Sequence, residues 1–280
     1  MVPGQPGQVL TPRCAVVGHP VQHSLSPAIH RAAYARLGLD WRFDRVDVAP
    51  GGLPDFVAGL GPEWRGLSVT MPHKEDAARL GEGDETVALT EVANTIVLGG
   101  DGPQVRNTDV SGFLVALRAH GIDRLDRVTV VGNGATARSA VAAVARLGAR
   151  EVSVLCRTPQ RAESVLALAD RLGMAARASA LGAGDLPSAD LLISTVPVDG
   201  VLGRQQELAR RAPVVFDSVY DPWPTPLGEA AAAHGRLALS GLDLLAGQAV
   251  EQVRWFTGTP VAFEVARASA QDGLNRHVEI

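Results

Sequence analysis

The chain has 280 residues, 46% of them hydrophobic, and a formal net charge of −4. That length suits two modest domains or one large one, and the apolar fraction is enough to build buried cores. The slight acidic excess argues against nucleic-acid binding, which needs clustered lysine and arginine. Since no apolar run approaches the roughly 18 residues of a membrane span, we expect neither nucleic-acid nor membrane partners.

Residues 1–10 are rich in Gly, Pro and Gln and contain neither a basic start nor an apolar run. They are not typical of a secretory signal, and we expect them to be disordered. Cys14 and Cys156 each border an apolar run, which favours small buried thiols over a disulfide. These features predict a cytoplasmic protein.

Short apolar runs alternate with helical patterns along the chain, which predicts an α/β fold with parallel sheets. In the first part, residues 14–18 (CAVVG) and 66–70 (GLSVT) are typical of buried strands. Residues 43–48 alternate apolar and polar side chains, as a half-exposed strand does. One sheet is therefore expected in this part.

Two helices are expected beside these strands. Residues 27–37 favour the first, with Ser26 as N-cap, Pro27 in the first turn and Gly38 as the stop. The second is expected over residues 74–80.

A second sheet-building pattern begins near residue 127. Residues 127–131 favour a strand, 136–147 an alanine-rich helix, and 152–156 the next strand, which together make a βαβ unit. Further strands of the same sheet are expected over 191–195 and 214–217.

Three further segments complete the pattern. Residues 109–121 favour a helix that bridges the two parts, and an apolar helix around 244–255 is expected to fold back on the first part. The polar end, 267–280, is expected to be loose.

A glycine-rich turn follows the strand at 127–131 and opens a helix: Gly132-Asn133-Gly134-Ala135-Thr136-Ala137. In such a G-x-G-x-x-A turn, the first glycine permits the tight bend and the second lets the backbone approach a pyrophosphate. The helix N-terminus offers free N–H groups to the phosphates. A tight turn without a ligand is the alternative, but a strand, a helix and a second strand in this order favour a dinucleotide site.

The end of the second strand distinguishes NAD from NADP. An enzyme that uses NAD usually places an acid there, whereas this chain has Cys156-Arg157-Thr158, with Arg161 one helical turn beyond. A guanidinium suits a 2′-phosphate through charge-assisted contacts and can stack on adenine. We therefore favour NADP over NAD, the alternative being solvated surface arginines.

Polar residues gather after the strands of the first part, where open α/β sheets bind ligands. They are expected to converge on one cleft, and they occupy positions 18–27 (GHPVQHSLSP), 71–74 (MPHK), 94–95 (NT) and 107–109 (NTD). His19, His23 and His73 match no zinc spacing and are not accompanied by clustered cysteines or carboxylates, so loop histidines are expected and no metal.

Seven motifs occur in order: HSLSP at 23–27, SVTMPHK at 68–74, NT at 94–95, NTDVSG at 107–112, CRT at 156–158, DSVYDP at 217–222 and GLDLLAGQ at 241–248. On these motifs the chain resembles the shikimate dehydrogenases from about residue 14 to residue 258. The resemblance implies an N-terminal substrate-binding α/β domain (10–112, with helix 244–265 packing back on it) and a C-terminal NADP-binding Rossmann domain (113–243).

The resemblance further implies NADPH-dependent reduction of 3-dehydroshikimate to shikimate, in the route to chorismate and the aromatic amino acids. Lys74 is the expected acid, because a cation beside the carbonyl oxygen stabilises the charge that develops there, and Asp109 is its partner. Their alternatives are a surface lysine and a helix cap. Ser24, Ser26 and Tyr220 are expected at the substrate carboxylate, the two serines pointing the same way from an extended segment.

Ring hydroxyls are expected to meet Ser68, Thr70, Asn94 and Gln248. The cofactor is expected to contact Gly132, Asn133, Gly134, Ala135, Thr136, Cys156, Arg157, Thr158, Arg161, Thr195, Val196, Pro197, Val219 and Gly241.

Three positions depart from the family pattern. Ser68 and Cys156 each stand where the family usually has Asn, and Leu244 stands where Met is common. The alternatives are a quinate or aminoshikimate dehydrogenase, with NADP or NAD, and an NADP-binding regulator without activity, although a regulator would be expected to lack Lys74 or Asp109. The expected assembly is a monomer or homodimer.

Overall fold

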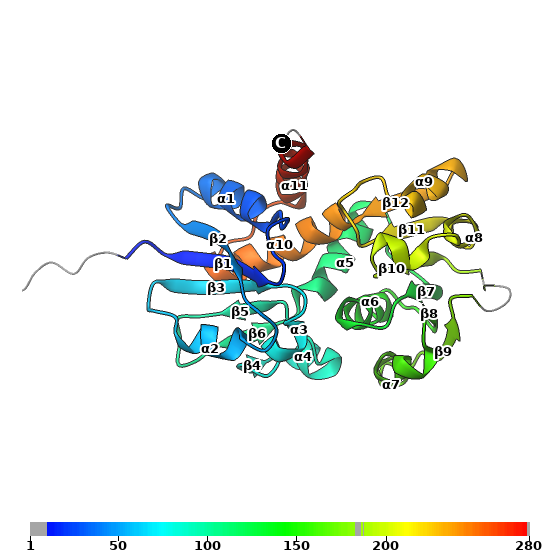
Figure 1. The fold of residues 1–280 in the computed structure, drawn as a ribbon, viewed down its shortest axis with the longest axis horizontal. Coiled ribbons are helices and arrows are strands. Elements are labelled where there is room, and N and C mark those ends of the chain that lie inside the picture. Colours follow the sequence, from blue (N-terminus) through cyan, green and yellow to red (C-terminus); the bar gives the residue numbers. More distant parts are fainter. Residues whose placement is uncertain (1–9, 183–185, 187, 279–280) are drawn as a thin grey trace, which may run out of the picture.

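The computed structural model describes residues 10–182, 186 and 188–278, which form two lobes, each built on a six-stranded sheet (Figure 1). The expectation of disorder for residues 1–9 lies outside the described residues. The α/β fold with two lobes is confirmed. The boundaries of the two domains stay a prediction.

The first lobe has strand order β2-β1-β3-β5-β6-β4. β1, β2 and β3 are parallel and so are β4 and β6, but β5 is antiparallel to β3 and β6 to β5, so parallel pairing was wrong for these two pairs. The short loop 98–103 joins β5 to β6, and so short a connection permits only an antiparallel pair. The elements are β1 (Arg13–Gly18), α1 (Ser26–Arg36), β2 (Arg42–Asp47), α2 (Leu53–Ala58), β3 (Trp64–Val69), α3 (Lys74–Ala77), β4 (Glu82–Gly83), α4 (Glu85–Thr90), β5 (Thr95–Val97) and β6 (Gln104–Arg106).

The second lobe has strand order β12-β11-β10-β7-β8-β9, and every neighbouring pair is parallel. This is the doubly wound order of dinucleotide-binding sheets, whose ligands lie at the carboxyl edge near the central switch point between β7 and β10. The elements are β7 (Arg127–Val131), α6 (Ala135–Ala145), β8 (Glu151–Cys156), η1 (Pro159–Ala162), α7 (Glu163–Arg171), β9 (Ala175–Ala180), β10 (Leu191–Ser194), η2 (Val198–Val201), α8 (Gln205–Arg210), β11 (Val214–Asp217), α9 (Pro226–Ala233) and β12 (Leu237–Ser240).

Two long helices, α5 (Thr108–Ala119) and α10 (Gly241–Thr257), cross between the lobes and pack on each other (Figure 1). Glycine allows the close crossing: a Cβ at Gly112 would lie 2.8 Å from the Gln248 nitrogen, and one at Gly247 would lie 2.4 Å from the Gly112 oxygen. A larger side chain at either position would force the helices apart.

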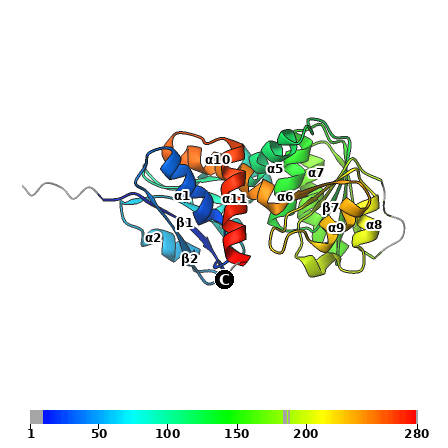
Figure 2. The same cartoon turned by 90° about the horizontal axis from the view of Figure 1, so that it is seen from above.

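The last helix, α11 (Phe263–Val278), packs on α1 and α10 (Figure 2), so the expectation of a loose end was wrong for the described residues. Ala266, Ala270 and Leu274 lie on one buried face, and Arg267 donates from Nε to Asp243 Oδ1 at 2.9 Å. Small apolar residues at helical spacing give this mostly polar segment one apolar face, and that face packs on α1 and α10.

One expected cap was also wrong. Leu25 is the N-cap of α1, with helical dihedrals (φ −87°, ψ −4°), and Ser26 is already the first helical residue. The Ser24 Oγ instead accepts a hydrogen bond from the Ser26 N–H at 3.3 Å. Since Leu25 is helical, the segment that carries the two serines is not the extended one that we expected.

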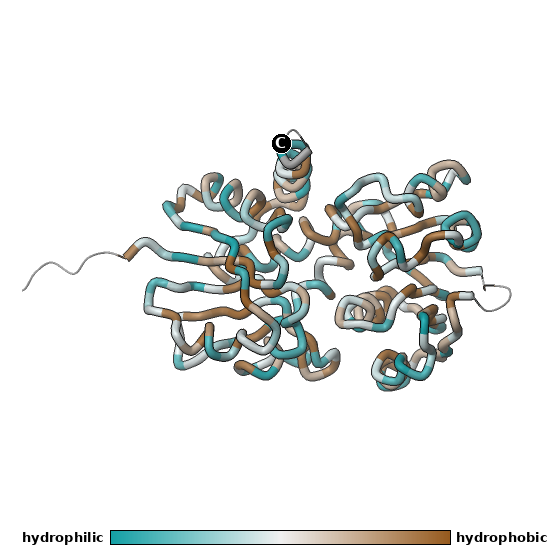
Figure 3. The backbone as a smooth tube through the Cα atoms, viewed as in Figure 1, coloured by the Kyte–Doolittle hydropathy of each residue, from teal (hydrophilic) through white to brown (hydrophobic). Residues whose placement is uncertain are grey.

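Hydrophobic residues concentrate in the strands at the centres of both lobes (Figure 3). Cys14 and Cys156 are buried free thiols, as predicted. Among the described residues, no helix is both long and apolar enough to cross a membrane.

Candidate active site

A cavity of about 270 Å³ lies where the two lobes meet. Residues expected at a substrate site line it from both lobes: Ser24, Ser26, Ser68, Thr70, Lys74, Asn94, Asp109, Tyr220 and Gln248. A neighbouring cavity of about 370 Å³ shares Thr70, Lys74 and Thr136 with the first and continues to Gly134, Ala135 and Thr195 of the second lobe. The polar residues of the first lobe therefore face the glycine-rich turn of the second.

Lys74 and Asp109 form an ion pair at the junction of the two cavities. Lys74 begins α3 after β3, Asp109 lies in the first turn of α5 after β6, and Lys74 Nζ lies 2.6 Å from Asp109 Oδ2. The side chains are 15% and 4% exposed, so little water competes with this contact. A buried carboxylate holds the ammonium in place, and removal of either partner would leave the other charge uncompensated.

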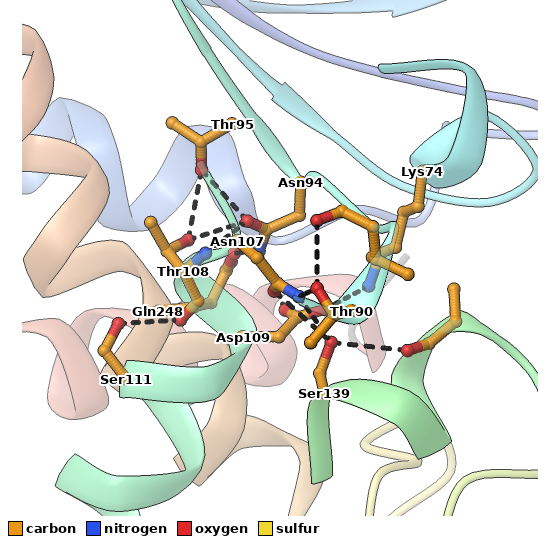
Figure 4. A network of polar contacts seen from close by, with 12 residues as sticks. Lys74, Thr90, Asn94, Thr95, Asn107, Thr108, Asp109, Ser111, Ser139 and Gln248 are labelled. Atoms are coloured by element: carbon orange, nitrogen blue, oxygen red, sulfur yellow. Dashed lines mark hydrogen bonds and ion pairs between the residues drawn. The ribbon is translucent and has the colours of Figure 1, made fainter. Parts of the chain in front are cut away.

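Asn94 fixes the other side of the Asp109 carboxylate (Figure 4). Its Nδ2 donates to Asp109 Oδ1 at 2.8 Å and to Gln248 Oε1 at 2.9 Å, while its Oδ1 accepts the Thr108 N–H at 2.7 Å. These two bonds use both amide hydrogens of Asn94. The side chain could therefore donate to a ring hydroxyl only by giving up one of them. Since the Gln248 Oε1 accepts from Asn94, the Nε2 of that side chain is the donor it offers to the cavity.

Ser24, Ser26 and Tyr220 line one end of the cavity, although the chain between the serines is not extended. Tyr220 follows β11 of the second lobe and packs with Leu25 of the first. Burial, and then the charge of Asp221, raises the pKa of the Tyr220 phenol, so it stays protonated and can donate a hydrogen bond. Hydroxyl donors of this kind suit an anionic group such as a carboxylate.

Ser68 has a partner that sequence reasoning missed. Its Oγ donates to Gln252 Oε1 at 2.8 Å, and Gln252 Nε2 donates to the Asn94 carbonyl at 3.1 Å. Gln252 lies one helical turn after Gln248 on α10, and that spacing could have indicated a shared face. Because the Ser68 proton is used, this hydroxyl offers only acceptor lone pairs to the cavity.

The carboxyl edge of the second sheet fits a dinucleotide. Gly132 has φ +113°, and a Cβ there would lie 2.3 Å from Thr195 Oγ1, whereas a Cβ at Gly134 would meet no atom within 4 Å. Open space at Gly134 is what a pyrophosphate needs, and the N-terminus of α6 has no side-chain cap that would compete for its N–H groups. Asn133 Nδ2 donates to the Arg161 carbonyl at 2.8 Å and ties the turn to the next loop.

The remaining cofactor candidates follow the carboxyl ends of neighbouring strands of this sheet. Arg157, Thr158 and Arg161 are exposed after β8, and Cys156 is buried at its end. Burial raises the pKa of the Cys156 thiol, which is therefore a neutral side chain there. The other cofactor candidates follow three further strands: Thr195, Val196 and Pro197 come after β10, Val219 after β11, and Gly241 after β12.

The three histidines of the first lobe have different surroundings. His19 is exposed and bonds Asp47 at 2.7 Å, His73 is buried and bonds the Val48 carbonyl at 2.7 Å, and His23 lines the cavity. Within the described residues, no group of three His, Cys, Asp or Glu side chains is arranged to hold a metal ion.

Comparisons with known proteins show the family of this chain. The model of the shikimate dehydrogenase substrate-binding domain matches residues 16–96. Shikimate dehydrogenase (NADP(+)) of Methylobacterium radiotolerans is 39% identical over 267 residues, which cover 90% of this chain and 94% of that protein.

Solved structures give the same result. The shikimate dehydrogenase of Mycobacterium tuberculosis has a TM-score of 0.87 and 39% identity, with 93% of this chain and 99% of that chain covered. The shikimate 5-dehydrogenase of Thermus thermophilus, solved in complex with NADP(H) and shikimate, has a TM-score of 0.79 and 31% identity, with 94% and 100% covered.

Proposed function

Because this chain belongs to the shikimate dehydrogenase family, we propose that it reduces 3-dehydroshikimate to shikimate with NADPH. It is an NADP-dependent oxidoreductase of the shikimate pathway, which supplies aromatic amino acid biosynthesis. The observation that carries this conclusion is the Lys74–Asp109 pair, which lies in a cavity continuous with the glycine-rich turn of the second lobe.

Lys74 is the proton donor of this mechanism. The reduced nicotinamide, when bound, supplies a hydride for the carbonyl carbon. The Lys74 ammonium donates a hydrogen bond to the carbonyl oxygen, stabilises the negative charge that develops there, and delivers the proton that completes the alcohol. Asp109 accepts from Lys74 Nζ at 2.6 Å and keeps the ammonium oriented toward the cavity.

Ser24, Ser26 and Tyr220 hold the substrate carboxylate in this proposal. Gln248 donates to a ring hydroxyl through Nε2, Thr70 offers its hydroxyl, and Ser68 accepts. Asn94 acts mainly through Asp109 and Gln248, because its own amide hydrogens are used. The set suits a small carboxylated polyol, which needs several neutral donors and acceptors.

The second lobe holds the cofactor. Gly132 to Thr136 receive the pyrophosphate at the N-terminus of α6, and the exposed Arg157 and Arg161 bind the 2′-phosphate that distinguishes NADP from NAD. Residues after β10, β11 and β12 complete the nicotinamide side of the site.

We infer a cytoplasmic location, since a biosynthetic enzyme that draws on NADPH meets its substrates there. Its partners are the substrate and the cofactor. We predict that the protein is a monomer or a homodimer. The domain limits at residues 112 and 243 also stay predictions.

An absorbance assay tests the function. NADPH oxidation is followed with 3-dehydroshikimate, and NADH replaces NADPH in a parallel series. We expect turnover with NADPH and a kcat/KM at least about tenfold lower with NADH, because the arginines lose the 2′-phosphate. Absence of turnover with both cofactors would refute the proposal.

The reverse reaction separates the alternatives. Oxidation of shikimate, quinate and aminoshikimate is compared with NADP and with NAD, and shikimate with NADP is expected to give the highest kcat/KM. A higher value for quinate or aminoshikimate would identify the chain as the corresponding relative, and binding of NADP without turnover of any of the three would identify a regulator.

A further inference from the structure

Arg45 lies behind the Ser24–Ser26 end of the cavity, on β2 of the first lobe. Its Nε and Nη2 both donate to the Ser24 carbonyl, at 2.9 and 2.7 Å. The guanidinium therefore holds the backbone that presents the Ser24 hydroxyl, and its positive charge lies next to the residues that line this end.

Two neighbouring arginines share one carboxylate. Asp44 forms ion pairs with Arg13 at 3.2 Å and with Arg31 at 3.6 Å. Among residues 10–182, 186 and 188–278, no carboxylate forms an ion pair with Arg45. Burial, and then the charge of Arg31, lowers the pKa of Arg45, but a guanidinium stays protonated at neutral pH.

An uncompensated, half-buried cation stabilises an anion held nearby, because the surrounding protein screens it less than water does. His23 also lines the cavity, but the side chains expected to hold the carboxylate, Ser24, Ser26 and Tyr220, are neutral hydrogen-bonding groups. They bind a carboxylate and a carboxamide in similar ways, so they do not by themselves select the charged group.

We propose that Arg45 is the specificity-determining residue that makes this site prefer a carboxylate over a neutral group of the same shape. The inference rests on the proposed function, since it concerns the carboxylate of the same substrate. Arg45 acts on the substrate carboxylate through the electric field of its positive charge, and it positions Ser24 through its hydrogen bonds to the Ser24 carbonyl.

The test measures the dissociation constants of shikimate and of its carboxamide by calorimetry, at low ionic strength, for the whole protein and its variants. In Arg45→Gln, we expect the preference for the acid over the amide to fall about tenfold. Arg31→Gln is the matched control, because it removes a neighbouring guanidinium that is 59% exposed and paired with Asp44. In Arg31→Gln, the preference for the acid over the amide is expected to change less than about twofold.

Arg45→Lys keeps the charge but cannot reproduce the paired contact with the Ser24 carbonyl. Its affinity for both compounds is expected to fall, while the preference for the acid stays within about threefold of the parent. This variant also tests the inference if Arg45→Gln does not fold, because a lost preference in Arg45→Lys would contradict it.

Equal weakening of acid and amide in Arg45→Gln would show that Arg45 only supports the loop, and it would overturn the inference while the proposed function stands. A parent protein that binds neither compound would overturn the proposed function, and this inference with it.

Discussion

Gln252 uses every hydrogen-bonding position of its side chain inside the first lobe. Its Oε1 accepts from Ser68 Oγ and from His30 Nε2 at 3.2 Å, and its Nε2 donates to the Asn94 carbonyl and to Thr95 Oγ1 at 3.0 Å. Because Oε1 only accepts, His30 carries its proton on Nε2. A single buried amide thereby links the floor of the cavity to the core of the lobe.

His30 makes the stability of the protein depend on pH. Burial lowers its pKa to about 3 from the ordinary 6.5, so the folded protein keeps this ring neutral while the unfolded chain binds a proton. The free energy of unfolding is therefore expected to fall as pH is lowered from about 6.5 toward 3, and His30 adds no pH dependence above that range.

His30→Phe checks this, because a phenyl ring preserves the stacking on Phe43, whose centroid lies 4.0 Å from that of His30. Urea unfolding between pH 4 and 7 is expected to give the variant a shallower dependence, by up to about 1.4 kcal/mol per pH unit. An identical slope in parent and variant would show that folding does not lower the pKa of His30, and it would contradict this prediction.

At the scale of elements, α6 is bonded to the first lobe through two consecutive residues. Arg138, whose side chain is 7% exposed, forms ion pairs with Glu75 and, at 3.8 Å, with Glu91. Ser139 Oγ accepts from Asn107 Nδ2 at 3.0 Å. Glu75 adjoins Lys74 and Asn107 lies two residues before Asp109, so the helix proposed to receive the pyrophosphate is tied to both members of the ion pair.

A double-mutant cycle on Arg138→Gln and Glu75→Gln tests this tie. We expect kcat to fall about tenfold in each single variant and by little more than that in the double variant, which corresponds to a coupling of about 1 kcal/mol. Arg146→Gln is the control, since Arg146 also reaches the first lobe, at Thr86, but is exposed there. Strictly additive losses would mean that the two residues act separately.

Elements with strong local patterns were predictable, and those that depend on tertiary packing were not. The strands at 127–131 and 214–217 agree with the observed bounds because short, mostly apolar runs identify buried parallel strands. β9 (Ala175–Ala180) was missed, since an edge strand of Ala, Arg and Ser has no apolar pattern. α11 was missed because its buried face is mostly alanine, which a polar composition conceals.

The candidate site was predictable to the extent that motifs carry it. Ordered motifs identified Lys74, Asp109 and their neighbours, which lie around one cavity. Gln252, Arg45 and Arg138 lie outside those motifs, and each matters only through a partner distant in the chain. No local pattern in a single sequence specifies such pairs.

At the scale of the whole molecule, the site exists only where the lobes meet. The first lobe contributes Lys74, the second contributes Thr136, and the crossing helix α10 contributes Gln248 to the same cavity. Neither lobe alone holds both the proposed proton donor, Lys74, and the sheet edge proposed to bind the dinucleotide. The close crossing of α5 and α10 at Gly112 and Gly247 therefore helps to set how the residues of the two lobes face each other across the cavity.

The most direct test of this account is the kcat/KM of NADPH oxidation with 3-dehydroshikimate in Lys74→Met beside the parent protein. The account predicts a fall of about a thousandfold with the dissociation constant of NADPH unchanged within about threefold, because the variant loses the proton donor but keeps the cofactor site. Turnover within about tenfold of the parent would contradict the assignment of Lys74 as the acid.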